Sequence, residues 1–160
     1  MSQAALDNPK EFAGRFTLVE ELVKRASCII YKATDKNLGN REVAVKVFVD
    51  RPNGNPEAIK AFEEEIAKLK GASHPSLVPV IAGGCEGDWF YLAMELIPGE
   101  TVRDALKESG GKLPIQTAVE IFKEMAEAAG EIHQQGIFHG HIDSRAVLYK
   151  GDKVRLAGYY

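Results

Sequence analysis

Cysteine is scarce in this chain of 160 residues, which has only Cys28 and Cys85 and no closely spaced pair. A disulfide framework or a zinc site needs more cysteines at shorter spacing, so both are excluded and a reducing compartment is favoured. No window approaches the ~18 apolar residues of a membrane-spanning helix, and the amino-terminal residues lack the apolar core of a signal sequence. The sequence therefore predicts a cytoplasmic protein without membrane insertion.

The chain also lacks a large excess of positive or negative charge. Twenty basic and 23 acidic residues leave a net charge of −3, and the isoelectric point is about 5.8. No basic excess is present to attract a phosphate backbone, so nucleic acid is not expected as a partner. The 45% hydrophobic and 27% charged residues are instead the ordinary composition of a globular domain.

Hydrophobic periodicity predicts a first half that is rich in β-strands. Apolar and polar residues alternate over 16–23, 28–33, 42–49, 77–82 and 89–96, and a glycine-rich turn over 83–88 joins the last two strands. After the third strand, Asn55 caps a helix that begins at Pro56 and runs to about Lys70. Residues 1–14 are expected to form an amino-terminal arm or a short helix.

The second half is predicted to be mainly helical. Thr101 caps a first helix that ends at the Gly110-Gly111 pair, and a longer helix runs from Pro114 to about Gln134. Two strand-like runs over 146–150 and 153–157 form a closing hairpin. We therefore expect an α+β fold of two lobes, at residues 15–97 and 98–160, with a hinge at 96–99.

Four short motifs stand in order along the chain: VAVK at 43–46, FEEEIAKL at 62–69, HPSLV at 74–78 and YLAMELIPG at 91–99. In this order and at these distances they resemble landmarks of the protein kinase family, most of all its bacterial serine/threonine branch. The resemblance covers about residues 16–160. It implies the family's small lobe, a five-stranded antiparallel sheet plus one helix, followed by a partial, mainly helical large lobe.

No glycine occurs between Phe16 and Leu38, where the resemblance places the family's glycine-rich loop. The glycine positions of that loop align with Val23, Arg25 and Cys28. In the family, residues without a side chain let the backbone amides close over the nucleotide phosphates. The sequence therefore predicts that no phosphate cradle forms here.

The segment GIFHGHIDSRAVLY at 136–149 is similar to the family's catalytic loop but lacks its chemistry. Aligned on His139, the catalytic aspartate position holds His141 and the metal-binding asparagine position holds Ala146. Shifting the alignment by two residues makes Asp143 the base, but Leu148 then occupies the asparagine position. Neither alignment restores the site.

The second metal-binding position of the family, an aspartate, aligns with Gly158, and no acid follows Asp152. Loss of the base and of both magnesium ligands predicts that phosphoryl transfer falls to background. A His139 and His141 pair without a third ligand is too weak a pattern for a metal site. We therefore expect no bound metal.

Lys46 and Glu65 match the strand lysine and helix glutamate that pair in the family, although a purely structural ion pair is equally consistent with them. Residues matching the adenine pocket could equally be ordinary core; they are Leu22, Ile30, Ala44, Lys46, Met94, Glu95 and Leu148. Leu69, His139 and Tyr159 match the packed column that joins the family's lobes. The resemblance implies no required cofactor, weak binding of ATP or an adenine-like ligand, and no magnesium.

The resemblance, with its missing catalytic residues, implies a pseudokinase-like regulatory or protein-interaction domain without phosphotransfer activity. The alternative is a divergent ATP-dependent serine/threonine protein kinase, or another nucleotide-dependent transferase that uses Asp143, active only in a longer chain. The helix over 114–134 carries apolar or small residues across more than one stripe. Its width predicts a protein partner or self-association through this helix.

Overall fold

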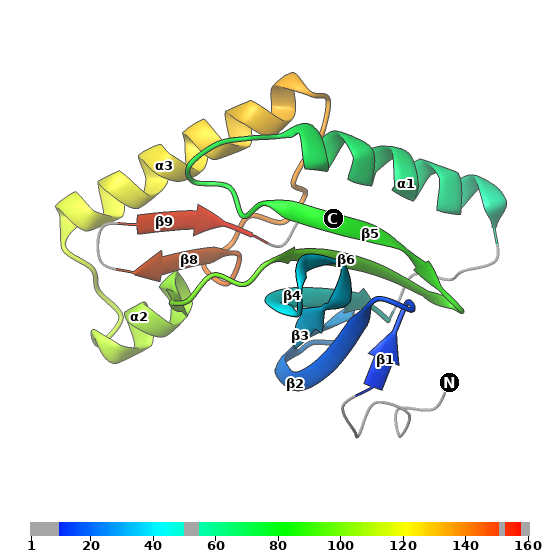
Figure 1. Ribbon diagram of the computed structural model, residues 1–160. Helices are drawn as coiled ribbons and strands as arrows, with labels where there is room; N and C mark the ends of the chain where they lie inside the picture. The colour runs from blue at the N-terminus through cyan, green and yellow to red at the C-terminus, as the bar shows by residue number, and fades with distance from the viewer. Residues whose placement is uncertain (1–9, 50–54, 151–152, 158–160) are drawn as a thin grey trace. The chain divides into compact units, whose positions relative to one another are not determined.

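The computed structural model describes residues 10–49, 55–150 and 153–157 (Figure 1). The chain divides into two compact units. The first comprises Met1–Lys70 and Val80–Leu96, and the second comprises Gly71–Pro79 and Ile97–Tyr160. Strands dominate the first unit and helices the second, as expected for the α+β class.

The first unit is built on a six-stranded antiparallel sheet with the order β1-β2-β3-β4-β6-β5. The strands are β1 (Lys10–Phe12), β2 (Phe16–Lys24), β3 (Cys28–Asp35), β4 (Arg41–Phe48), β5 (Val80–Glu86) and β6 (Trp89–Glu95). Sequential strands pair from β1 to β4. The helix α1 (Pro56–Gly71) then separates β4 from β5, and β5 lies at the far edge of the sheet.

One face of this sheet carries the main apolar core. Side chains alternate along β4, so that Val43, Val45 and Val47 all enter a cluster that also contains Phe16 and Tyr31. Phe16, Val43 and Val45 are completely buried. Ala44, Lys46 and Phe48 fall on the opposite face by the same alternation.

Asp35 ends β3 as a fully buried acid with a matched basic partner. Its two carboxylate oxygens accept hydrogen bonds of 2.8 and 2.7 Å from the Arg15 guanidinium, and Oδ1 also accepts from the Asn37 N–H at 2.9 Å. The hydrogen bonds from Arg15 lower the pKa of Asp35 below its usual value. The ion pair therefore ties the start of β2 to the end of β3.

Helix α1 begins and packs as the sequence predicts. Asn55 caps it, because its side-chain oxygen accepts the Glu57 N–H at 2.9 Å. The buried stripe consists of Phe62, Ile66 and Leu69, at spacings of three and four residues. Through this stripe the helix covers one side of the sheet.

The second unit contains β7 (Glu100–Thr101), α2 (Val102–Glu108), α3 (Ile115–Gln134), β8 (Val147–Lys150) and β9 (Lys153–Leu156). The three strands form an antiparallel sheet in the order β7-β8-β9. Thr101 caps α2 as predicted, accepting the Asp104 N–H at 3.2 Å. Helix α3 buries Ile121, Ala128, Ala129 and Ile132. No helix among the described residues is long and apolar enough to cross a membrane.

The strand predicted over 77–82 is wrong at its start, because β5 begins at Val80. Leu77 instead forms an isolated parallel bridge with Leu156 of β9, and the Val78 N–H donates to the Leu156 carbonyl at 2.9 Å. Pro79 has no N–H to continue a ladder. The residues before β5 therefore belong to the second unit.

The glycine-rich turn predicted over 83–88 is also shorter than expected. Strand β5 continues to Glu86, and only Gly87 and Asp88 form the turn. A Cβ atom on Gly83 would lie 2.8 Å from the side chain of Ile66 on α1. Gly83 is thus a point of close helix–strand approach, one of the ordinary reasons for a glycine inside a strand.

Two short strands were not predicted. Residues 10–12 fall in the segment expected to be an arm or short helix, but they form β1, and Phe12 pairs with Phe16 of β2. Phe12 is buried, and its ring lies edge-on to Tyr91 with centroids 5.3 Å apart. The two-residue strand β7 is the second case. Strands this short show no alternation that a sequence pattern could reveal.

Candidate functional site

Lys46 lies on the central strand β4, on the face of the sheet opposite the main core. Its register partners are Ile30 on β3 and Leu92 on β6, and the residue is only 3% exposed. Its Nζ lies 4.8 Å from the centroid of the Phe48 ring, a cation–π distance. The lysine is therefore a buried cation that packs over an aromatic ring.

Glu65 approaches the same face from α1. It is half-buried and lies between the buried Phe62 and Leu69 along the helix. The Phe62 ring packs against Phe48 at 6.0 Å, and Lys46 lies over that same Phe48 ring. The structure thus places Lys46 and the helix that carries Glu65 on the same side of the sheet. The direct pairing of Lys46 with Glu65 stays a prediction.

Three of the proposed adenine-pocket residues share this face of the first unit. Ala44 pairs with Met94, and Ile30 pairs with Lys46, so alternation sends all of their side chains to one side. Ala44 and Met94 are buried. Leu22 on β2 differs, because 42% of it is exposed.

The last two proposed pocket residues, Glu95 and Leu148, do not share this face. The Glu95 carboxylate at the end of β6 forms an ion pair with Arg41 at 2.7 Å. Leu148 lies on β8 of the second unit, where it pairs with Arg155. The set named from the sequence is therefore divided between the two units.

The β2–β3 turn, which occupies the place of a glycine-rich loop, closes on itself. The Arg25 N–H donates to the Cys28 carbonyl at 2.9 Å, and the Val49 N–H donates to the Ser27 carbonyl at 2.9 Å. Cys28 is almost fully buried, and Val23 is half-buried on β2. The Arg25 amide, which already donates within the hairpin, is not aimed at an external phosphate.

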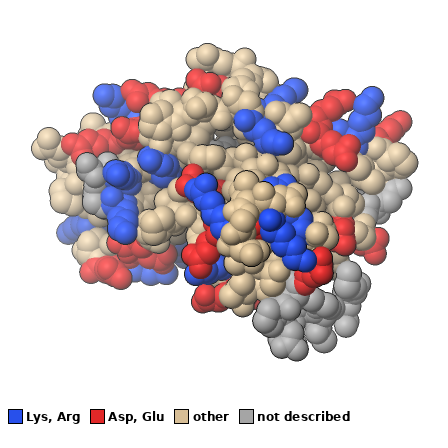
Figure 2. All heavy atoms as spheres, in the orientation of Figure 1, with Lys and Arg blue, Asp and Glu red and all other residues tan. Residues whose placement is uncertain are grey.

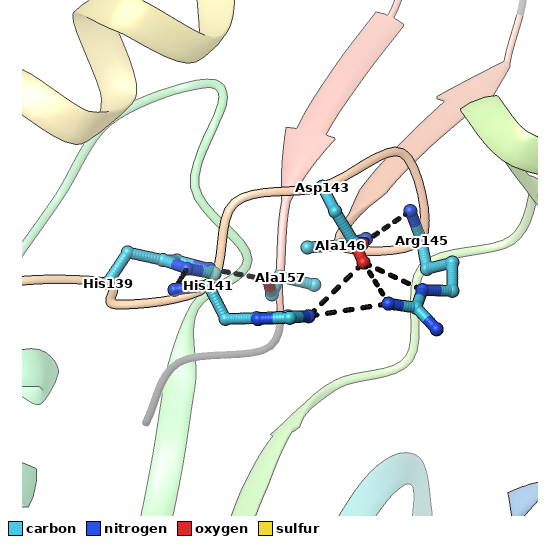
Figure 3. A network of polar contacts seen from close by, with 6 residues as sticks. All are labelled: His139, His141, Asp143, Arg145, Ala146 and Ala157. Atoms are coloured by element: carbon cyan, nitrogen blue, oxygen red, sulfur yellow. Dashed lines mark hydrogen bonds and ion pairs between the residues drawn. The ribbon is translucent and has the colours of Figure 1, made fainter. Parts of the chain in front are cut away.

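His139 organises the loop that follows α3 (Figure 3). Its ring is 2% exposed, and both ring nitrogens are engaged. Nδ1 accepts the His141 N–H at 3.4 Å, and Nε2 lies 2.8 Å from the Ala157 carbonyl oxygen. A carbonyl only accepts, so Nε2 carries the proton and donates it. His139 therefore joins the loop to the residue after β9, and neither nitrogen is left to bind a metal.

Asp143 is held by hydrogen bonds from its own loop (Figure 3). Oδ1 accepts the backbone N–H groups of Arg145 at 2.8 Å and Ala146 at 3.1 Å. Oδ2 accepts from Arg145 Nε at 2.7 Å and from Arg145 Nη2, and it lies 3.2 Å from His141 Nε2. The side-chain hydrogen bonds of Arg145 lower the pKa of Asp143 to about 2. A carboxylate of that pKa is a poor general base at neutral pH.

The remaining positions of the catalytic segment offer little for chemistry. His141 is half exposed and its Nε2 lies 3.4 Å from Arg145, while Ala146 is buried and carries only a methyl group. Gly158 and Tyr159 lie outside the described residues. Over residues 10–49, 55–150 and 153–157, no group of three or more His, Cys, Asp or Glu could hold a metal ion.

Sequence reasoning missed the partner of Asp143. It treated the aspartate as a candidate base and assigned no role to Arg145. The available signal was the spacing Asp-x-Arg in a loop, because an aspartate readily accepts the backbone N–H two residues later. That turn brings the arginine side chain back onto the same carboxylate.

The fold, the buried strand lysine, the helix glutamate and the histidine-centred loop together define a protein-kinase-like domain with an altered catalytic segment. The family model described as protein tyrosine and serine/threonine kinase matches residues 14–158. The chain therefore belongs to this family.

The curated relatives that match this chain include bacterial serine/threonine-protein kinases. It is 32% identical over 139 residues to the Probable serine/threonine-protein kinase CPE1738 of Clostridium perfringens, across 87% of this chain and 20% of that protein. It is 29% identical over 140 residues to serine/threonine-protein kinase PrkC of Bacillus subtilis, across 87% of this chain and 21% of that protein. The chain thus spans about a fifth of the length of these relatives.

The solved Mycobacterium tuberculosis PknI kinase domain has the same fold. It matches with a TM-score of 0.83 and 21% identity, over 94% of this chain and 61% of that chain. The predicted kinase-like fold is confirmed: an antiparallel sheet with one helix, followed by a partial, mainly helical region.

Proposed function

We propose that this chain is a pseudokinase-like domain that acts in regulation or protein binding and transfers no phosphoryl group. The proposal rests on one observation, the set of hydrogen bonds that the Asp143 carboxylate accepts. Asp143 is the single carboxylate of the loop over 135–146, and the same loop saturates it with hydrogen bonds. His141, the exposed imidazole of that loop, has its Nε2 3.2 Å from Asp143 Oδ2 and 3.4 Å from Arg145 Nη2, within the same network.

The residues present do not fit a magnesium nucleotide bound in the family's manner. Magnesium is held through carboxylates and substrate phosphates, and the family positions for its protein ligands hold Ala146 and Gly158. In the β2–β3 turn the Arg25 N–H already donates to the Cys28 carbonyl. We expect only the adenine ring of ATP to bind, and to bind weakly, against the apolar face around Lys46, Ala44 and Met94.

An active enzyme is the second candidate, because the curated relatives are named serine/threonine-protein kinases. Lys46 and Glu65 keep the residue types of the family's lysine–glutamate pair. Under this alternative the chain would be a divergent kinase or nucleotide-dependent transferase that uses Asp143, competent in a longer polypeptide. Its catalytic base would first have to release Arg145.

A phosphotransfer assay separates the two candidates. The chain is incubated with labelled ATP, magnesium or manganese, and generic protein substrates, beside a Lys46→Ala variant and an active kinase as the positive control. We expect no label transfer above that of the Lys46→Ala variant. Transfer that Lys46→Ala abolishes would support the enzyme and refute the pseudokinase proposal.

Nucleotide binding gives an independent prediction. Ligands that bind the folded state raise the unfolding temperature by mass action. We expect ATP to give a small shift or none, and magnesium not to increase it, because the family's magnesium-ligand positions hold Ala146 and Gly158. Thermal-shift measurements with ATP, with ATP plus magnesium and with adenosine test this. A stabilisation by ATP that requires magnesium would contradict it.

A further inference from the structure

Strand β5 lies at one edge of the six-stranded sheet, where β6 is its one partner among the described strands (Figure 1). Its hairpin with β6 closes through a two-residue turn, so Glu86 and Trp89 form the hydrogen-bonded pair next to the turn. Hydrogen-bonded pairs alternate from there, which turns the backbone N–H and C=O groups of Gly83 and Cys85 away from β6. No backbone hydrogen bond from another described residue satisfies these outward groups.

The carboxyl-terminal part of this edge is not protected against pairing with another chain. Charges, prolines and bulges are the usual features that keep an edge strand from such pairing. A bulge between Val80 and Ala82 interrupts the ladder, but the stretch from Ala82 to Cys85 carries neither a charge nor a proline. The open edge is therefore limited to residues 82–86.

Gly84 lies in the middle of this stretch without a conformational or packing requirement from the described residues. Its φ is not in the positive range, and a Cβ atom there would meet the Tyr91 side chain at 3.5 Å, an ordinary van der Waals contact. A glycine inside a strand weakens it, and one reason for such a glycine is the close approach of another backbone. Gly83 is already explained by Ile66 on α1, so Gly84 is the residue that indicates an additional strand.

Three acids lie around the carboxyl end of β5: Glu63 on α1, Glu86 in the strand and Asp88 in the turn. Burial, and then the charges of Asp88, Glu86 and Glu63, raise the pKa of the Cys85 thiol, so all three acids act on this end of the strand. None of them forms an ion pair with a described residue, and Figure 2 shows acidic side chains among the charged groups over α1. Outside the described ranges the chain contains one basic side chain, Arg51, which cannot neutralise three acids.

We propose that the outer edge of β5 binds an extended peptide segment of a partner protein, which adds an antiparallel strand beside residues 82–86. Main-chain hydrogen bonds to Gly83 and Cys85 supply affinity and continue the antiparallel pattern of the sheet. The amino-terminal end of such a strand lies beside the carboxyl end of β5, so basic residues at that end of the peptide face the three acids. The edge uses no residue assigned above to phosphoryl transfer, so this proposal stands or falls independently of the proposed function.

Amide hydrogen exchange of the free chain tests whether the edge is open. We expect protection factors for the Gly83 and Cys85 amides about tenfold lower than for the Gly84 amide, which donates toward β6. Equal protection of the three amides would show that another part of the chain covers the edge, and it would overturn the proposal.

NMR titration of the ¹⁵N-labelled chain with the capped peptide Ac-KKTVTVT-NH2 measures binding. We expect a Kd below about 1 mM, shifts centred on Gly83 and Cys85, and weaker binding as salt is raised. Two control peptides carry N-methyl groups on one or the other alternate set of residues, and only the set that faces β5 should weaken binding, by about tenfold. The reversed peptide Ac-TVTVTKK-NH2 should bind severalfold more weakly. Equal binding of the two methylated peptides, or no binding at millimolar peptide, would overturn the proposal.

Matched variants locate the added strand. Cys85→Pro removes an outward N–H without removing a donor to β6, so it should weaken peptide binding about tenfold, whereas Cys85→Ser keeps the N–H and should leave Kd unchanged. Glu86→Gln/Asp88→Asn should weaken binding severalfold, and the control Glu108→Gln, an exposed acid on α2, should not. Equal affinities of Cys85→Pro and Cys85→Ser would show that the peptide does not pair with this edge.

Discussion

The Asp143 carboxylate receives four hydrogen bonds from Arg145 and Ala146, two through each oxygen. Two come from backbone N–H groups and fix the turn, and two come from the arginine side chain and balance the charge. A residue at this point of the loop can therefore be acidic without taking part in proton transfer. Residue type alone does not separate a structural aspartate from a catalytic one.

This arrangement predicts the titration of Asp143. Its carboxyl group should titrate with a pKa of about 2. Arg145→Gln removes the guanidinium and should raise that pKa toward the ordinary ~3.9, whereas the exposed control Arg103→Gln should leave it unchanged. Carboxyl ¹³C shifts followed by NMR through acid pH provide the measurement. An ordinary pKa for Asp143 in the native chain would remove the main support for the proposed function.

Asp35 gives a second prediction at the scale of single residues. Asp35→Ala leaves Arg15 without the partner of its bidentate contact, and we expect a loss of ~3–5 kcal/mol in the free energy of unfolding. Glu42→Ala is the matched control, since it removes the exposed partner of Lys32 and should cost less than ~1 kcal/mol. Urea titration at neutral pH compares them. Equal losses would show that the Arg15 pair contributes no more than a surface pair.

The same acid sets a pH dependence. Its folded-state pKa is lowered, so its stabilising contribution is fully present above the unfolded-state value of ~3.9 and is lost as the pH falls through the folded-state value. Stability should thus be insensitive to this group between pH 5 and 7 and should fall below pH ~4. Asp35→Asn replaces the carboxylate with a near-isosteric amide, so this variant should lose less stability below pH ~4. An unchanged loss of stability at low pH would show that other carboxylates cause the acid unfolding.

At the scale of elements, the Phe62 ring on α1 links the helix to the sheet. Its centroid lies 6.0 Å from Phe48 and 4.7 Å from Phe90. Phe62→Ala opens a cavity between these rings and should cost ~3–5 kcal/mol. Lys46→Met, which keeps the length of the side chain over the Phe48 ring, should cost less than ~1 kcal/mol. If urea titration shows equal losses in the free energy of unfolding, the Lys46 side chain stabilises this unit as much as the Phe62 ring does.

The elements that the sequence predicted well are the ones with long hydrophobic patterns. Helices α1 and α3 have stripes repeated over several turns, and β2, β3, β4 and β6 are seven to nine residues long. The strand predicted over 77–82 was misplaced because Leu77 and Val78 are apolar for another reason, their contact with β9. Side-chain pairs such as Asp143–Arg145 depend on loop conformation, which no periodicity encodes.

At the scale of the whole molecule, α3 presents an apolar stripe that no described residue covers. Ile115, Val119 and Phe122 are 80%, 59% and 71% exposed, and their spacing of four and three places them on one side of the helix. The buried Ile121, Ala128 and Ile132 lie on another side. The wide apolar face expected from the sequence is therefore present as two stripes.

We expect this stripe to pair with a second copy of the chain. A two-fold pairing through Ile115, Val119 and Phe122 would bury the stripe of each copy against that of the other. Light scattering after size exclusion should show a dimer at micromolar concentration. Phe122→Glu/Val119→Lys should give a monomer, whereas the control Lys112→Ala should not. A monomeric native chain would refute the pairing.

The Asp143–Arg145 pair has a consequence for how the chain responds to its ionic surroundings. An acidic loop near a nucleotide site commonly needs a divalent ion to offset its charge, and it loosens when that ion is removed. Here the Arg145 side chain, two residues along the same loop, balances the charge of the Asp143 carboxylate. Chelators and changes in cellular magnesium should therefore leave the conformation of this loop unchanged. A binding surface that includes the loop would therefore keep the same shape whether or not a divalent ion is present.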